Sequence, residues 1–207
     1  DPSNENVLKA RGYLSPMAHI GIVIAPRLFQ DKEYQVSKQI LESAGHRVTV
    51  MSTQQTCVGK FGTRVEADEY ISDADPTGYD ALVLIGGPGA PALAENRDML
   101  DLLRTARDAG LLLCAICIAP TILVKAGLLE GCRATVYPDP DAIALLHRSH
   151  VIYVQQPVIQ DGRHPAFPWS AHQTRQGWRQ SEPATAGYHR RIPSVPLSSY
   201  PRRWPLI

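Results

Sequence analysis

Residues 111–123 read Leu-Leu-Leu-Cys-Ala-Ile-Cys-Ile-Ala-Pro-Thr-Ile-Leu. The first six form a continuous apolar run, as in a strand that is buried on both faces. After Cys117 the chain enters a predicted helix over residues 119–126, with Pro120 in the first turn, where proline fits. So abrupt a passage from strand to helix is typical of the junctions of α/β proteins. This stretch therefore predicts an α/β fold with Cys117 at one of its hinges.

The alternation of strand and helix extends outward from this stretch. Residues 19–25 are predicted to form a buried strand, residues 31–44 an amphipathic helix that stops at Gly45, and residues 46–51 a second strand. A unit of this length implies parallel strands joined by a right-handed crossover. The same patterns predict strands at 79–85, 133–136 and 151–154, helices at about 93–109 and 141–147, and a hairpin at 155–163 with Asp161-Gly162 as its turn.

The charge of the chain is divided unevenly between two segments. The 207 residues carry a formal net charge of +1, but six Arg and a single acid give residues 164–207 a charge of +5, which leaves −4 for the rest. The two prolines at 165 and 168 stand where a strand returning from the hairpin needs N–H donors, so no strand is expected there. We expect residues 164–207 to be an atypical Arg/Pro/Trp-rich tail or the product of a shifted reading frame.

Composition excludes several classes of protein. With 44% hydrophobic residues, the chain is neither broadly disordered nor fibrous. Its longest apolar runs are much shorter than the roughly 20 residues of a membrane-spanning helix. Residues 1–18 form a polar N-terminal extension without the features of a secretory signal, which predicts a cytoplasmic protein. The negative body gives no support for nucleic acid as a partner, and no membrane partner is expected.

Cys117 is the candidate nucleophile. A side chain at such a hinge is pushed out of the sheet, and the helix N-terminus behind it is expected to lower the thiol pKa. The alternative is a buried cysteine that packs as a small hydrophobic residue. A disulfide with Cys114 is disfavoured, because that residue lies within the strand and an odd separation sends strand side chains to opposite faces. No Cys or His pair has zinc spacing, so no metal is expected.

Two further strand ends carry candidate residues. Gly86-Gly87 follows a strand directly and could aim backbone N–H groups at an oxyanion, together with the Cys117–Ile118 region. Glu33 lies in the first turn of the helix that follows the first strand, where the helix dipole favours a carboxylate. From spacing alone, however, Glu33 reads as a solvated surface charge.

Together these motifs resemble the ThiJ/PfpI family over about residues 19–163, with residues 164–207 outside the match. The matching segments, in order, are the opening strand, Glu33, Ala44-Gly45, residues 79–89, residues 115–120, residues 125–129 and Asp161-Gly162. The resemblance implies a flavodoxin-like parallel sheet sandwiched by helices, in a protein that is usually a homodimer. It implies that Cys117 is the nucleophile, that Glu33 hydrogen-bonds the thiol, and that the backbones of Gly86, Gly87 and Ile118 bind an oxyanion.

Two departures from the family pattern reduce the number of functions that the sequence supports. Ile118 stands where protease-like members have histidine, and Tyr137 stands where other members place a histidine near the thiol. A Cys117–Glu33 dyad remains, which predicts a cofactor-independent cysteine enzyme acting on small reactive carbonyls or glycated groups, as in a glyoxalase or deglycase. The alternative is an oxidative-stress sensor or chaperone-like protein without turnover. An intracellular peptidase or amidase is the third possibility.

Overall fold

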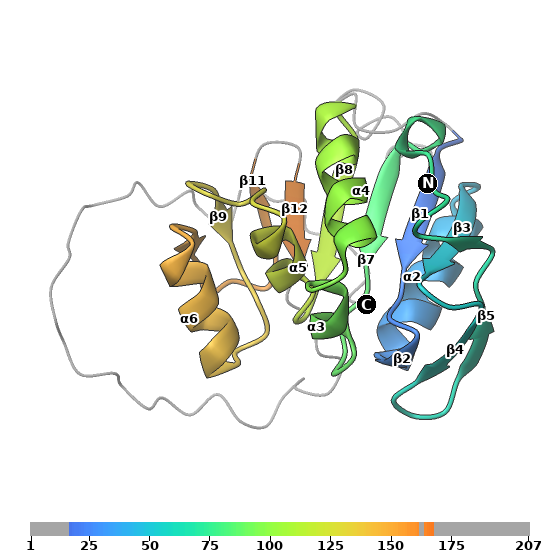
Figure 1. Cartoon of the computed structure of the whole chain (residues 1–207), viewed down its shortest axis with the longest axis horizontal. Coiled ribbons are helices and arrows are strands. Elements are labelled where there is room, and N and C mark those ends of the chain that lie inside the picture. The colour runs from blue at the N-terminus through green and yellow to red at the C-terminus, as the bar shows by residue number, and fades with distance from the viewer. Residues whose placement is uncertain (1–16, 162–163, 168–207) are drawn as a thin grey trace, which may run out of the picture. The chain divides into compact units, whose positions relative to one another are not determined.

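The computed structural model describes residues 17–161 and 164–167, and its centre is a seven-stranded sheet (Figure 1). Every neighbouring pair of strands is parallel except β11 and β12. Across the sheet the order is β11 (Ile159–Asp161), β12 (His164–Phe167), β8 (Leu112–Ile116), β7 (Ala81–Leu84), β1 (His19–Val23), β3 (Arg47–Ser52) and β6 (Glu69–Tyr70). The predicted α/β fold with a mostly parallel sheet is confirmed.

Helices cover both faces of this sheet. In Figure 1, α2 (Asp31–Ser43) lies behind it, while α4 (Arg97–Asp108) and α5 (Pro120–Lys125) lie in front. The first strand and the residues after it supply both layers of the core: Ile22 and Ile24 pack in the cluster that contains Tyr34 of α2, and Val23 packs in the cluster that contains Leu103 of α4. This alternation explains why residues 20–25, which follow His19, are apolar throughout. The other helices of the described residues are α3 (Ala90–Leu93), α6 (Pro140–Arg148) and the 3₁₀ helix η1 (Pro76–Gly78).

A small three-stranded sheet, which the sequence patterns did not predict, stands beside the carboxyl ends of the central strands. It consists of β2 (Arg27–Phe29), β4 (Thr56–Gly59) and β5 (Arg64–Glu66). The buried carboxylate of Asp31 holds it to the start of α2, accepting hydrogen bonds from the N–H groups of Phe61 and Thr63, both at 2.9 Å. A Cβ on Gly59 would lie 2.3 Å from Asp31 Oδ1, so glycine leaves the space that this anchor occupies.

Two expectations are wrong in detail. The helix predicted at 93–109 begins later, as α4 at Arg97, and a separate short helix, α3, precedes it, because the Asn96 side chain accepts a hydrogen bond from Met99 N–H at 2.8 Å and starts a new helix. A strand does follow Arg163, although none was expected: β12 pairs antiparallel with β11 and parallel with β8. The prolines do not prevent it, because only Ala166 and Phe167, which lie between Pro165 and Pro168, pair with β8.

The other predicted elements have their counterparts in the structure. They include the strands β9 (Arg133–Ala134) and β10 (Ile152–Tyr153), which precede and follow α6 in the chain and pair with each other. The extension at residues 1–16, the turn residues 162–163 and the tail from residue 168 onward lie outside the described residues. Within the described part, no helix is both long enough and apolar enough to cross a membrane.

Candidate active site

The hinge predicted at Cys117 is present. Cys117 follows β8 directly, and its φ of 59° lies in the left-handed region that L-residues avoid. The turn is closed by a hydrogen bond from Ala119 N–H to the Ile116 carbonyl at 3.0 Å, and α5 begins at Pro120. Cys117 is 9% exposed, so the residue is mostly buried but a small part of it lies at the surface. Strain at this one residue therefore turns the thiol away from the sheet, as at a nucleophile elbow.

Glu33 lies beside this thiol and is not a surface charge. The side chain is 1% exposed, in the first turn of α2, and its Oε2 accepts a hydrogen bond from Gly86 N–H at 3.0 Å. Its other oxygen, Oε1, is buried with no hydrogen-bond partner among the described residues. The surface interpretation from spacing is wrong, because the parallel topology brings the start of α2 against the ends of β7 and β8.

Gly86 lies between Cys117 and the Glu33 carboxyl group, and the position needs the smallest residue, glycine. A Cβ at this position would lie 2.8 Å from Cys117 Cβ and 2.9 Å from Glu33 Oε2, so any side chain would push the thiol and the carboxyl group apart. The Gly86 N–H is already engaged by Glu33, which corrects the expectation that it binds an oxyanion. The backbone of Gly86 positions the carboxyl group instead.

Gly87 and Ile118 supply the two backbone donors that face the sulfur. Both N–H groups act on Cys117 so as to lower the pKa of its thiol. Gly87 has a φ of 102°, and a Cβ there would lie 2.5 Å from the backbone nitrogen of Gln30, so only glycine fits. Such a pair of fixed N–H groups can also stabilise the oxyanion that forms when the sulfur attacks a carbonyl group.

The expected lowering of the Cys117 pKa is wrong. Burial, and then the charge of Glu33, raise the pKa of the Cys117 thiol to about 12, against the two backbone donors. Loss of water disfavours the charged thiolate, and this is the largest influence on Cys117. Burial raises the pKa of Glu33 to about 7, more than the hydrogen bonds from Gly86 and Cys117 lower it. The resting pair is thus a neutral thiol beside a carboxyl group that titrates near neutrality.

The remaining candidates do not join this site. All four cysteines are free, so Cys114 and Cys117 are not bonded to each other. Among residues 17–161 and 164–167, no group of three His, Cys, Asp or Glu side chains could hold a metal. Tyr137 does lie next to Cys117, since its N–H donates to the Cys117 carbonyl at 2.8 Å, but its side chain is 40% exposed and is no substitute for an imidazole base.

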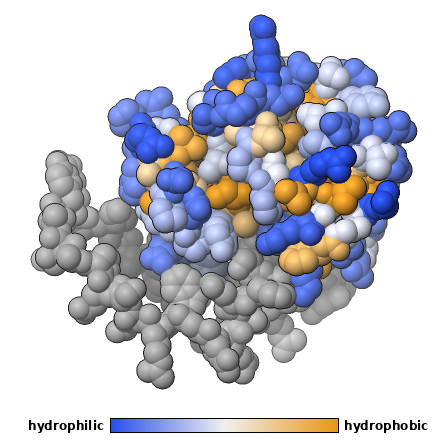
Figure 2. Space-filling view, turned by 60° about the horizontal axis from the view of Figure 1, so that its bottom comes forward, coloured by the Kyte–Doolittle hydropathy of each residue, from blue (hydrophilic) through white to orange (hydrophobic). Residues whose placement is uncertain are grey.

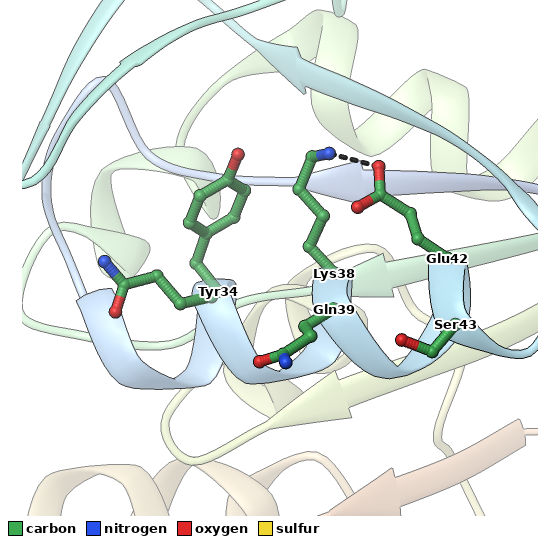
Figure 3. A pocket seen from close by; sticks show the side chains of 6 residues that line it. Tyr34, Lys38, Gln39, Glu42 and Ser43 are labelled. Carbon is green, nitrogen blue, oxygen red and sulfur yellow. Dashed lines mark hydrogen bonds and ion pairs between the residues drawn. The ribbon is translucent and has the colours of Figure 1, made fainter.

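A hollow of about 450 Å³ lies along the outer flank of α2, away from this pair (Figure 3). The Lys38 ammonium group and the Glu42 carboxylate form an ion pair across it. Neither Cys117 nor Glu33 lines it, and its carboxylate and ammonium groups neutralise each other, so it offers no chemistry of its own. Its lining residues are Tyr34, Gln35, Lys38, Gln39, Glu42 and Ser43.

The fold and this site define a class of proteins, the flavodoxin-like α/β proteins with a cysteine at a strand-to-helix elbow. A model of the DJ-1/PfpI family matches residues 18–165, and the chain belongs to that family. The solved ThiJ/PfpI domain protein from Brachyspira murdochii is 27% identical, with a TM-score of 0.69 over 73% of this chain and 87% of that one. The resemblance inferred from the sequence is confirmed.

Some curated relatives have an activity in their names and others do not. An uncharacterised protein of Methanocaldococcus jannaschii is 37% identical over 70% of this chain and 72% of its own length. A deglycase of Pyrococcus abyssi is 31% identical over 68% of this chain and 84% of its own length. The DJ-1β protein of Drosophila melanogaster is 31% identical over 68% of this chain and 75% of its own length.

Proposed function

We propose that this protein is a cysteine enzyme that acts on small reactive carbonyl compounds or on glycated groups through the Cys117–Glu33 pair. The observation that carries the proposal is the buried Glu33 carboxyl group beside the thiol, with its pKa raised to about 7. A general base works best when its pKa lies near the working pH. The names of several relatives, which are called deglycases at about 30% identity, support the same substrate class.

The reaction begins with a proton transfer within the pair. The Glu33 carboxylate accepts the thiol proton while the Cys117 sulfur forms a bond to the carbonyl carbon of the substrate. The π electrons of that carbonyl move to its oxygen, and the N–H groups of Gly87 and Ile118 stabilise the resulting oxyanion. Glu33 then returns the proton to this oxygen, which gives a hemithioacetal and restores the carboxylate.

With a 2-oxoaldehyde, the same base completes an internal redox reaction. Glu33 removes the proton from the carbon bonded to sulfur, and the electron pair left behind forms the double bond of an enediol as the neighbouring carbonyl oxygen takes up a proton. Glu33 then returns its proton to the second carbon while the hydroxyl group on the first carbon loses its proton, so the first carbon is oxidised to a thioester and the second is reduced to an alcohol. Water then attacks the thioester, the carbon–sulfur bond breaks, the sulfur takes up a proton, and a 2-hydroxy acid is released while the Cys117 thiol is regenerated. No external oxidant, reductant or cofactor enters this balance.

Two features of the site lead us to favour this function over an amidase or a peroxide sensor. An amidase or peptidase needs a group that protonates the leaving amine, and the neighbouring positions hold Ile118 and the exposed Tyr137. A peroxide sensor needs a thiolate, whereas burial and Glu33 keep the pKa of Cys117 high. Base-assisted addition to a carbonyl group requires no standing thiolate, because the proton leaves as the new bond forms.

Incubation with methylglyoxal and measurement of lactate test the proposal. We expect turnover by the wild type, loss of it in Cys117→Ser, and wild-type rates in Cys132→Ser, a matched control at a partly buried cysteine immediately before β9. Equal turnover in Cys117→Ser would overturn the proposal. A homodimer belongs to the same proposal and is tested by light scattering during size-exclusion chromatography.

A further inference from the structure

Three residues other than glycine have a positive φ among the described residues: Leu28 at 59°, Cys117 at 59° and His150 at 56°. Two of them have evident reasons. Cys117 forms the elbow, and His150 follows the end of α6, where helices commonly end in a left-handed residue. Leu28 lies in neither setting. A bulky side chain rarely adopts this conformation, so a reason for it has to be found in its surroundings.

Leu28 is the extra residue of a bulge between β2 and β4. Arg27 pairs with Val58 and Phe29 pairs with Gly59, so two steps along β2 match one step along β4. A left-handed residue in a bulge is usually glycine, and bulges next to active sites redirect a side chain. Here the redirected residue is leucine, and its side chain is 49% exposed.

The bulge lies against the loop that carries the oxyanion donor. The Leu28 carbonyl accepts a hydrogen bond from Gly89 N–H at 3.1 Å, and it would lie 2.6 Å from a Cβ on Gly87. Gln30 N–H donates to the Gly86 carbonyl at 3.0 Å, which fixes the other side of the bulge. β2 is at the carboxyl edge of the sheet, the lower edge in Figure 1. Figure 2 turns this edge forward and shows hydrophobic residues among hydrophilic ones.

We propose that the Leu28 side chain is a specificity-determining wall of the Cys117 site, in contact with an apolar substituent on the reacting carbonyl compound. This inference rests on the proposed function. The preferred substrates are then 2-oxoaldehydes with a small alkyl group, such as methylglyoxal, over glyoxal, which has none. If the bulge served only to bring the Leu28 carbonyl to the Gly89 N–H group, glycine would be tolerated at position 28, because glycine is the residue least strained in this conformation.

Leu28→Gly separates the two explanations, because it preserves the backbone and removes the side chain. We expect kcat/KM for methylglyoxal to fall about five- to tenfold, the discrimination that one contacting methyl group gives, with less than a twofold change for glyoxal. Thermal unfolding should change little, since relief of strain offsets the greater freedom of the unfolded chain. Leu28→Met should retain the preference for methylglyoxal.

The matched control is His150→Gly, which relieves the same backbone conformation at a position outside the site. It should leave the ratio of the two substrates unchanged. Equal losses for both substrates in Leu28→Gly, or no loss for either, would overturn the assignment of Leu28 as a substrate-contacting wall.

A second measurement keeps this inference separate from the proposed function. Cys117 is alkylated with maleimide and with N-ethylmaleimide, which differ by one apolar group, and the labelled peptide is quantified by mass. If the wild type turns over neither aldehyde, the proposed function fails, yet a preference for N-ethylmaleimide that falls severalfold in Leu28→Gly would still support the wall. An unchanged ratio of the two alkylation rates would overturn it.

Discussion

Cys114 and Cys117 are three residues apart, and burial contributes to a pKa of about 12 for both thiols. Their surroundings differ completely. Cys114 lies within β8 opposite Val83, and burial is the only influence on its thiol. Cys117 leaves the sheet at the elbow and has Glu33 and two backbone donors around it. The comparison shows that the partners of a cysteine, and not its own acidity in the resting state, distinguish a reaction site from a structural position.

The largest effect is expected when the Glu33 carboxylate, which distinguishes Cys117 from Cys114, is removed. Glu33→Gln retains an oxygen that can accept the Gly86 N–H but cannot take the thiol proton, so we expect kcat/KM for methylglyoxal to fall about 10²- to 10⁴-fold. Without its base, Cys117 becomes as inert as Cys114. A loss smaller than tenfold in steady-state lactate production would mean that the two cysteines do not differ through Glu33.

The pH dependence of the wild type should report the same carboxyl group. Glu33 acts as a base only when ionised, so kcat/KM should be constant above its pKa of about 7 and should fall about tenfold per pH unit below it. The acidic limb should disappear in Glu33→Gln. A profile of kcat/KM that instead rises up to pH 9 or beyond would assign the ionisation to the thiol.

Gly86→Ala should move Glu33 away from Cys117, so that this thiol, like that of Cys114, loses its carboxyl partner. The added Cβ meets both Cys117 Cβ and Glu33 Oε2 at less than 3.0 Å, so it separates the pair and overpacks the site. We expect about a tenfold loss in kcat/KM and about 1–3 kcal/mol less free energy of unfolding in urea. Gly78→Ala is the matched control, because no atom lies within 4 Å of the added Cβ, and wild-type values are expected there.

The smallest effect is expected at Cys114 itself. Cys114→Ala removes one partly buried sulfur from β8, which should lower the free energy of unfolding by about 1 kcal/mol and leave kcat/KM within about twofold of the wild type. Urea unfolding and the lactate assay check this on the same preparation. A large loss of activity would show that the two thiols act together.

Much of the fold could be predicted because its strands are buried on both faces. The run at residues 19–25 and the passage from β8 through Cys117 have patterns that only a central parallel strand and an elbow satisfy. The division between α3 and α4 was missed because it depends on one side chain, Asn96, capping a helix within an otherwise helical pattern. The β12 strand could not be predicted, because the sequence does not reveal that only Ala166 and Phe167, and not the prolines beside them, pair with β8.

The site was less predictable than the fold. Spacing located Cys117, but the burial of Glu33 depends on how α2 packs against the ends of β7 and β8, which no local pattern encodes. The direction of the Cys117 pKa also depends on burial and on the neighbouring carboxyl group rather than on the helix that follows. The conformation of Leu28 arises from a mismatch between two strands, and neither Leu28 nor its direct neighbours Arg27 and Phe29 are residue types that signal it.

The buried carboxyl group of Glu33 also links folding to proton uptake. Its pKa rises from an ordinary 4.5 to about 7 on folding, so between these values the folded chain binds a proton that the unfolded chain releases. The contribution of Glu33 to stability is therefore fully present below pH 4.5 and is lost as the pH rises through 7. The ionised form that would act as the base is the form that weakens the fold, so mild acidification favours the folded protein while it removes the base.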